Sequence, residues 1–325
     1  MKPGKRQVDR AMNVDRPEKQ TVRKLWIEKA TAVDSAEGHN SVPLYLTLSG
    51  AEGKDIDALI AAGLVSRADN NAIAEVHKFK VIAVEASPMA VLQLQRKFPG
   101  LKILEQSFQN IIHGSEPYAW PGKEHENYCR AQIINLDLNE PLRAVIDDEG
   151  DIAFPVLAWI AKLAQLHTRP PRIDWTLCLT LHGEILWDER ACEFVQDFLA
   201  DNFRFEEEFA LACGGLLGAD ICEQIASGAA MNFSDLDRGL QQAILMVFVP
   251  KFLMKMVQHQ GWNIDTDYNL RYGSGIAAPM VTWVCQFTWS TNAKKAPAAA
   301  YRQGLKNIFK RAGEIDACGG IIELS

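Results

Sequence analysis

The amino-acid sequence predicts an α/β fold: a doubly wound, mostly parallel sheet with a C-terminal antiparallel β-hairpin and a helical insertion. Two observations predict it. Short apolar runs of strand length alternate with helical patterns over the first half of the chain, which is typical of a parallel sheet covered by helices on both faces. Near the C-terminus, two longer strand-like runs flank a Gly-rich loop, which is the pattern of a hairpin.

The predicted core domain spans residues 41–204. Its five strands are expected at the apolar runs 44–48, 81–85, 101–105, 131–137 and 175–181. Apolar residues at helical spacing predict helices at 55–65, from Pro88, and at 154–167, with Ser87 and Pro88 forming an N-cap followed by a proline in the first helical position.

The remaining segments are expected to extend and cover this sheet. A helix at 189–201 follows the fifth strand, and residues 205–261 are helical by periodicity, which predicts a helical insertion. Residues 262–290 are expected to form the hairpin, with strands at 262–271 and 280–288. Residues 291–325 are expected to form a basic helix, over about 298–311, and a tail.

Composition limits the class of protein. With 325 residues, of which 48% are hydrophobic, the chain can form one large α/β domain with additions, or two domains. No apolar run reaches the ~20 residues that span a bilayer, so we expect a cytoplasmic protein with no membrane partner.

The seven cysteines are scattered, without a Cys-x-x-Cys pair or a histidine at zinc-site spacing, so we expect free thiols and no metal site. The oligomeric state is left open.

Charge is distributed unevenly along the chain. The formal net charge is −7, yet residues 1–30 hold nine Lys or Arg and four acids, so the remainder carries −12. Because residues 1–40 also have little apolar periodicity, we expect a basic, flexible N-terminal segment there. A solvated tail is the simpler interpretation, and a nucleic-acid-binding arm is the alternative.

The most informative stretch runs from Pro43 to Glu85. Its first apolar run stops at the turn Ser49-Gly50-Ala51-Glu52-Gly53, and its second run ends on Glu85. Glycines allow a tight turn and a close approach of the backbone to a ligand, while a carboxylate at the tip of the next strand can accept hydrogen bonds from ribose hydroxyls. The stretch therefore predicts an adenosine-containing cofactor, with ordinary turn glycines as the alternative.

Five βα units followed by an antiparallel hairpin is the order of elements in class I S-adenosylmethionine-dependent methyltransferases, and the chain resembles this Rossmann-like superfamily over about residues 41–290. The resemblance implies S-adenosylmethionine as cofactor. It implies contacts from the turn residues Ser49, Gly50 and Gly53, from Glu85 to the ribose, and from Ser107 or Phe108 beside the adenine. The chain departs from the family pattern at Leu48, where an acid is usual, and in having only a Gly-x-x-Gly core.

Three further residues are candidates for the methyl-transfer step. The resemblance implies that Asn135 and Asp137, at the end of the fourth strand, face the donor and acceptor, where they offer oxygen acceptors for an amino group. The Pro-Pro-aromatic part of the amino-methyltransferase loop is absent, and a capping role for Asp137 is the alternative. His182 follows the fifth strand at the same sheet edge and is a candidate general base, with a loop histidine without a role as the alternative.

These observations favour an S-adenosylmethionine-dependent methyltransferase whose acceptor is a nucleic acid rather than a small molecule. The preference for a nucleic acid rests on the basic N-terminal segment, the basic C-terminal helix and the pair Asn135 and Asp137. A catalytically inactive binding protein with the same fold is one alternative. A nicotinamide-dependent oxidoreductase is another, although the hairpin and the incomplete Gly-x-Gly-x-x-Gly turn count against it.

Overall fold

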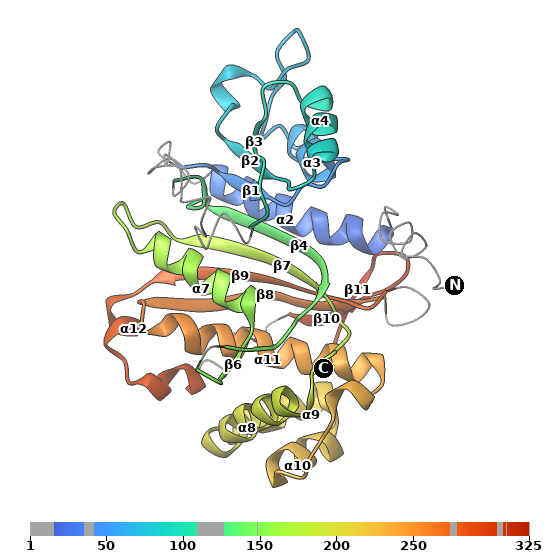
Figure 1. Ribbon diagram of the computed structural model, residues 1–325, viewed down its shortest axis with the longest axis vertical. Coiled ribbons are helices and arrows are strands. Elements are labelled where there is room, and N and C mark those ends of the chain that lie inside the picture. The colour runs from blue at the N-terminus through green and yellow to red at the C-terminus, as the bar shows by residue number, and fades with distance from the viewer. Residues whose placement is uncertain are drawn as a thin grey trace.

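The computed structural model of the chain describes residues 16–35, 42–108, 127–147, 149–273, 278–303, 308–309 and 311–324. Within these residues, one sheet of nine strands has the order β11-β10-β8-β9-β7-β4-β1-β2-β3 (Figure 1). Five consecutive parallel strands form one side of it, with β3 at the edge: β1 (Tyr45–Thr47), β2 (Val81–Val84), β3 (Lys102–Leu104), β4 (Ile133–Pro141) and β7 (Trp175–His182). The predicted α/β class with a large, mostly parallel sheet is confirmed.

The direction in which strands are added reverses at β1. From β1 the chain moves outward to β2 and β3, and it then returns to place β4 and β7 on the other side of β1. Ligands of open α/β sheets bind outside the carboxyl ends of the strands at such a reversal point. The topology therefore marks the gap between β1 and β4 as the place to look for a site.

The C-terminal part of the sheet is mixed. The strands β8 (Trp262–Tyr272) and β9 (Met280–Trp289) form the antiparallel hairpin, and β9 also runs antiparallel to β7 along the length of β7. Two further strands, β10 (Ala312–Ile315) and β11 (Ile321–Glu323), extend the sheet beyond β8. Sequence periodicity did not predict them, because each has at most four residues.

The prediction of a basic α-helix over 298–311 is wrong for those of its residues that the structure describes. Instead, a short helix α12 (Thr291–Lys295) is followed by the 3₁₀ helix η3 (Ala298–Gln303), and residues 304–307 and 310 lie outside the described residues. The alanines favour an α-helix, but Nζ of the buried Lys251 donates to the carbonyl oxygens of Tyr301 and Arg302 at 3.2 and 2.6 Å. This contact ties the 3₁₀ turn to the neighbouring helix.

Helices cover both faces of the sheet. The strand residues alternate between two apolar clusters, as Tyr45 and Leu46 do, because successive side chains point to opposite faces. One cluster takes residues from α2 (Pro17–Ser35), α3 (Lys54–Ala61) and α4 (Pro88–Lys97), and the other takes residues from α7 (Pro155–His167), α8 (Glu189–Phe205) and α11 (Arg238–Gln258). Small elements complete the description: β5 (Val145–Ile146), β6 (Ile152–Ala153), η1 (Glu75–His77) and η2 (Phe233–Asp235).

Helix α2 corrects the expectation of a flexible segment over residues 1–40. Pro17 occupies its first helical position, and Val22, Leu25 and Trp26 are buried at helical spacing against the sheet. The stripe is narrow and lies among many charges, so its periodicity was weak in the sequence. Residues 1–15 and 36–41 lie outside the described residues.

The helical insertion is shorter than the predicted span 205–261. Only α9 (Glu207–Leu217) and α10 (Ala219–Ser227) pack on α8 at the end of the molecule far from β1, β2 and β3 (Figure 1). By contrast, α11 packs on β8 and α7 and so belongs to the core. Among the described helices, α11 alone is long and apolar enough to cross a membrane, but 83% of its most apolar window is buried inside the fold, as in a core helix.

Candidate functional site

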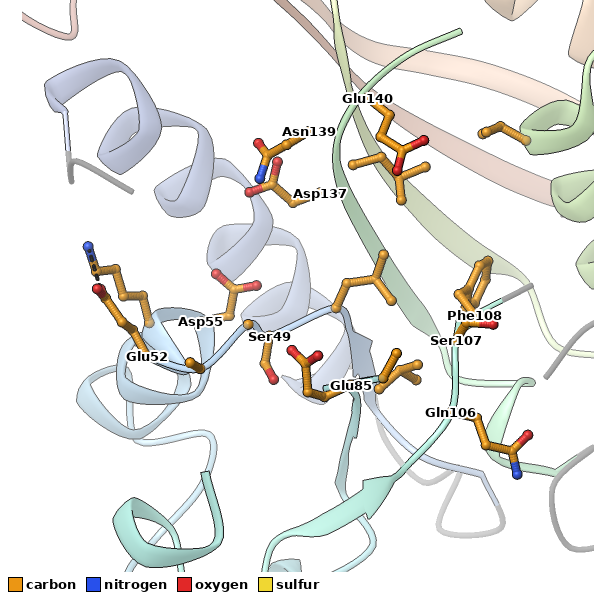
Figure 2. A pocket seen from close by; sticks show the side chains of 18 of the residues that line it. Ser49, Glu52, Asp55, Glu85, Gln106, Ser107, Phe108, Asp137, Asn139 and Glu140 are labelled. Carbon is orange, nitrogen blue, oxygen red and sulfur yellow. Dashed lines mark ion pairs between the residues drawn. The ribbon is translucent and has the colours of Figure 1, made fainter. Parts of the chain in front are cut away.

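A pocket of about 570 Å³ lies at the carboxyl ends of β1, β2 and β4, where the strand order reverses (Figure 2). Its volume falls within the range of small-molecule sites. The residues of the first half of the chain that line it are Lys19, Arg23, Leu48, Ser49, Gly50, Ala51, Glu52, Lys54, Asp55, Val84, Glu85, Ala86, Gln106, Ser107 and Phe108. Those that follow are Asp137, Leu138, Asn139, Glu140, Val156 and Trp159.

The two turn glycines have different surroundings. Both adopt the left-handed conformation, with φ of 55° at Gly50 and 56° at Gly53, which side chains disfavour. A Cβ added to Gly50, which lines the pocket, would meet nothing within 4 Å. A Cβ added to Gly53 would lie 2.5 Å from Cε2 of Phe98, so this glycine allows α4 to pack on the start of α3. Gly53 does not line the pocket, and its position indicates a packing role rather than the predicted cofactor contact.

A buried polar cluster supports the floor of the pocket. The carboxylate of Asp55 accepts hydrogen bonds from Thr47 Oγ1 at 2.8 Å, from Asn135 Nδ2 at 2.6 Å and from Arg23 Nε at 3.1 Å. Burial raises the pKa of Asp55, while the Thr47 hydrogen bond and the charge of Arg23 act in the opposite direction. These four residues, the Asp55 cluster, join α2, β1, α3 and β4 under one pocket.

The Asp55 cluster changes the interpretation of Asn135. This side chain is fully buried beneath the pocket, does not line it, and holds Asp55 instead of facing an acceptor. Sequence reasoning missed Asp55 itself, because an acid in the first turn of a helix is commonly explained by the helix dipole. The available signal was its place two residues after Gly53, just beyond a turn whose strand lacks the acid expected at Leu48.

The predicted ribose and adenine residues face each other across the pocket. Figure 2 shows Glu85 beside Ser49, with Ser107 and Phe108 on the opposite side. The half-buried Glu85 accepts a hydrogen bond from the backbone N–H of Ser87 at 2.8 Å. Phe108 packs edge-on against Trp159, with 6.5 Å between ring centroids, and both rings are buried. The pocket thus has a carboxylate on one wall and an apolar wall opposite.

The end of β4 brings oxygen atoms together with a lysine from α2. Nζ of Lys19 lies 3.6 Å from Oδ2 of Asp137 and donates to Oδ1 of Asn139 at 3.4 Å. Figure 2 shows Asp137 and Asn139 next to each other beside α2. Two buried atoms of the pocket residues, Oδ1 of Asp137 and Oγ of Ser49, have no hydrogen-bond partner among the described residues. Buried polar atoms of this kind are expected to be satisfied by a ligand or water.

The candidate base His182 lies apart from these residues. It ends β7 at the same sheet edge, beside Pro141 of β4 and Met280 of β9, but it does not line the pocket. Burial lowers its pKa, partly offset by Glu184, whose Oε2 lies 3.9 Å from its Nδ1. His182 thus lies at the same end of the strands as the pocket but outside the residues that line it.

The basic residues near the C-terminus also lie elsewhere. Strand β9 ends beside Trp175, the first residue of β7, so Lys294 and Lys295 follow at the sheet edge opposite the pocket. Arg302 forms an ion pair with Asp201 of α8. Within the described ranges, no group of three or more His, Cys, Asp or Glu side chains is arranged to hold a metal ion.

Comparison of the whole chain with protein-family models finds no match, and comparison with curated proteins finds no significant match. The functional interpretation therefore depends on the geometry and charge of the pocket.

Proposed function

We propose that the protein is an S-adenosylmethionine-dependent methyltransferase. One observation carries the proposal: residues from four separate segments, to which the family resemblance assigns cofactor and acceptor contacts, line a single pocket at the reversal point of the sheet. They are Ser49, Gly50, Glu85, Ser107, Phe108 and Asp137. Such convergence of distant segments is what a binding site requires.

The charge of the pocket favours this cofactor over a dinucleotide. Its lining holds five carboxylates and three cations among the residues named above. S-adenosylmethionine carries a sulfonium, an ammonium and one carboxylate, and its net positive charge suits a net negative pocket. The pyrophosphate of a nicotinamide dinucleotide would face those carboxylates at a Coulombic cost. This observation counts against the oxidoreductase alternative.

Individual residues suit parts of the cofactor. The carboxylate of Glu85 would accept ribose hydroxyl hydrogen bonds, the partnerless Oγ of Ser49 would gain a polar contact, and the wall formed by Phe108 and Trp159 would exclude water around the adenine. When bound, the sulfonium supplies an electrophilic methyl carbon. The protein's part is to position the acceptor in line with that carbon, for which Asp137 provides carboxylate oxygens at the pocket wall.

The acceptor is the less constrained part of the proposal. A nucleic acid is favoured by the sequence, but the C-terminal basic residues Lys294 and Lys295 lie at the far sheet edge, which weakens that argument. Helix α2, in contrast, places Lys19 and Arg23 at the pocket. A catalytically inactive binding protein would use the same pocket, so binding and turnover need separate measurements.

Calorimetric titration with S-adenosylmethionine, S-adenosylhomocysteine and NAD tests the proposal. We expect the first two to bind and NAD not to bind. Glu85→Ala should weaken binding by ~1–3 kcal/mol, the value of hydrogen bonds to a charged group. Glu75→Ala, which removes an exposed acid outside the pocket, is the matched control and should bind like the wild type.

The absence of binding to both sulfur compounds would contradict the proposal. Binding that is insensitive to Glu85→Ala would place the cofactor elsewhere. Binding without methyl transfer to nucleic acid, protein or small amines would favour the inactive binding protein.

A further inference from the structure

Helix α2 places two cations on the pocket one helical turn apart, and they are held differently. Arg23 pairs with Asp55 at 3.1 Å, and the side chains of the pair are only 16% and 9% exposed. Lys19 contacts Asp137 and Asn139 at the longer distances of 3.6 and 3.4 Å, at the more exposed end of the pocket. Arg23 therefore anchors α2 to the Asp55 cluster. The amine of Lys19 takes no part in that anchor.

The amine of Lys19 lies in the pocket beside oxygen atoms that could hold an amino group for methylation. A lysine ammonium has three donors and no acceptor. Two oxygen atoms of β4 lie near it, Oδ2 of Asp137 at 3.6 Å and Oδ1 of Asn139 at 3.4 Å. The other carboxylate oxygen of Asp137, Oδ1, is buried and has no hydrogen-bond partner among the described residues. Lys19, Asp137 and Asn139 all line the pocket that also holds Ser49 and Gly50, where the proposed methyl donor would lie.

We propose that Lys19 is a methyl acceptor within its own chain, that is, a self-methylation site; this inference rests on the proposed function. The ammonium first loses one proton, for which the carboxylate of Asp137 is the base within reach. The lone pair of Nζ then forms an N–C bond to the methyl carbon of the methylsulfonium donor, while the C–S bond breaks and its electron pair stays on sulfur. The products are a thioether and a methylammonium that carries the positive charge formerly on sulfur.

A second lysine of the pocket provides an internal comparison. Lys54 also lines the pocket, but its Nζ lies 3.0 Å from Oε2 of Glu52 on the glycine turn and not at the end of β4. A lysine modified only because it is near the donor would not discriminate between Lys19 and Lys54. Selective modification of Lys19 would point to the oxygen atoms of Asp137 and Asn139.

The first test is mass spectrometry of the purified full-length chain after incubation with S-adenosylmethionine. We expect a mass gain of one or more methyl groups that peptide mapping places on Lys19. The gain should disappear in Lys19→Arg and persist in Lys24→Arg, which changes an exposed lysine of α2 outside the pocket. Asp137→Asn should slow the gain about tenfold or more, as expected for the loss of a general base.

The second test does not depend on turnover. Lysines of the wild-type chain are labelled with an amine-reactive ester, with and without S-adenosylhomocysteine. We expect the bound thioether to reduce labelling of Lys19 several-fold and to leave Lys24 unchanged.

The outcomes separate the two proposals. Cofactor binding with no methyl on Lys19 and no protection of Lys19 overturns the self-methylation site and leaves the proposed function standing. Methylation at Lys54 instead of Lys19 also overturns it. Failure of the chain to bind either sulfur compound overturns both proposals.

Discussion

Two buried regions of the molecule are built on opposite principles. The aromatic core on the α11 side of the sheet packs Phe248 against Phe154, Phe252, Phe198 and Trp187, with ring centroids 5.1 to 5.8 Å apart. Most of these rings meet edge-on or tilted, which aromatic pairs prefer. Most of the stability expected from burying these rings is nevertheless hydrophobic, which is non-directional and grows with the apolar area removed from water.

The Asp55 cluster, on the other side of the sheet, depends on direction and charge. Each of its hydrogen bonds needs one donor in one place, and burial of its carboxylate and guanidinium has a desolvation cost that the pairing offsets only in part. The aromatic core therefore supplies stability, whereas the Asp55 cluster sets the positions of α2, β1 and β4 around the pocket.

The largest effect is expected in the aromatic core. Phe248→Ala removes a fully buried ring, and we expect it to lower the free energy of unfolding by about 3–5 kcal/mol, the transfer and cavity cost of such a truncation. Urea unfolding measures this change. Leu211→Ala, at an exposed position of α9, is the control and should change stability by less than ~0.5 kcal/mol. A small effect of Phe248→Ala would mean that the surrounding rings collapse into the space.

The second effect is a loss of stability in acid from His167. This histidine is fully buried, stacks on Trp175 with 4.6 Å between centroids, and burial lowers its pKa to about 4. Between pH ~6.5 and ~4 the unfolded chain binds a proton that the folded chain does not, so stability falls as the pH falls. The full loss over this window is about 3 kcal/mol, because the folded chain takes up the proton only near pH 4.

Carboxylates also titrate in this range, so the histidine contribution needs a difference measurement. Urea unfolding of the wild type and of His167→Gln at pH 7 and pH 4.5 isolates it, because the variant cannot take up that proton. We expect the stability gap between the two proteins to narrow in acid. An unchanged gap would show that His167 does not carry the acid sensitivity.

The third prediction compares the stability lost when a buried and a more exposed ion pair, both made by acids of α3, are removed. Asp55→Ala removes the buried carboxylate that accepts hydrogen bonds from Arg23 and Asn135, and we expect a loss of about 2 kcal/mol together with faster amide exchange in α2. Asp57→Ala removes an acid that is 44% exposed and pairs with Lys97, and it should cost less than ~1 kcal/mol. Urea unfolding and hydrogen exchange measure both. Equal effects of the two variants would contradict the role given to the Asp55 cluster.

Local patterns predicted most of the sheet. The strands at 81–84 and 175–182 begin where their apolar runs predicted and end within one residue of the predicted positions, because buried parallel strands are continuous apolar runs. Helix α4 begins at Pro88, where Ser87 and the proline predicted it, and the Oγ of Ser87 caps the N–H of Ala90 at 3.4 Å. Patterns failed where few residues carried the signal, as in β10, β11 and the narrow apolar stripe of α2.

Sequence patterns were enough to predict the α/β class, the positions of the central strands along the chain, and Gly50 and Glu85 just after the first and second strands, because periodicity and turn chemistry act over neighbouring residues. Asp137 was predicted as the last residue of the fourth strand, but β4 continues to Pro141. Which of these residues come into contact depends on how the distant elements pack. The tertiary structure placed Asn135 under the pocket and left His182 outside the pocket lining, and it brought Lys19 and Arg23 of α2 to side chains 118 and 32 positions away. Such contacts depend on the packing of one apolar stripe onto a whole sheet, which no local pattern encodes.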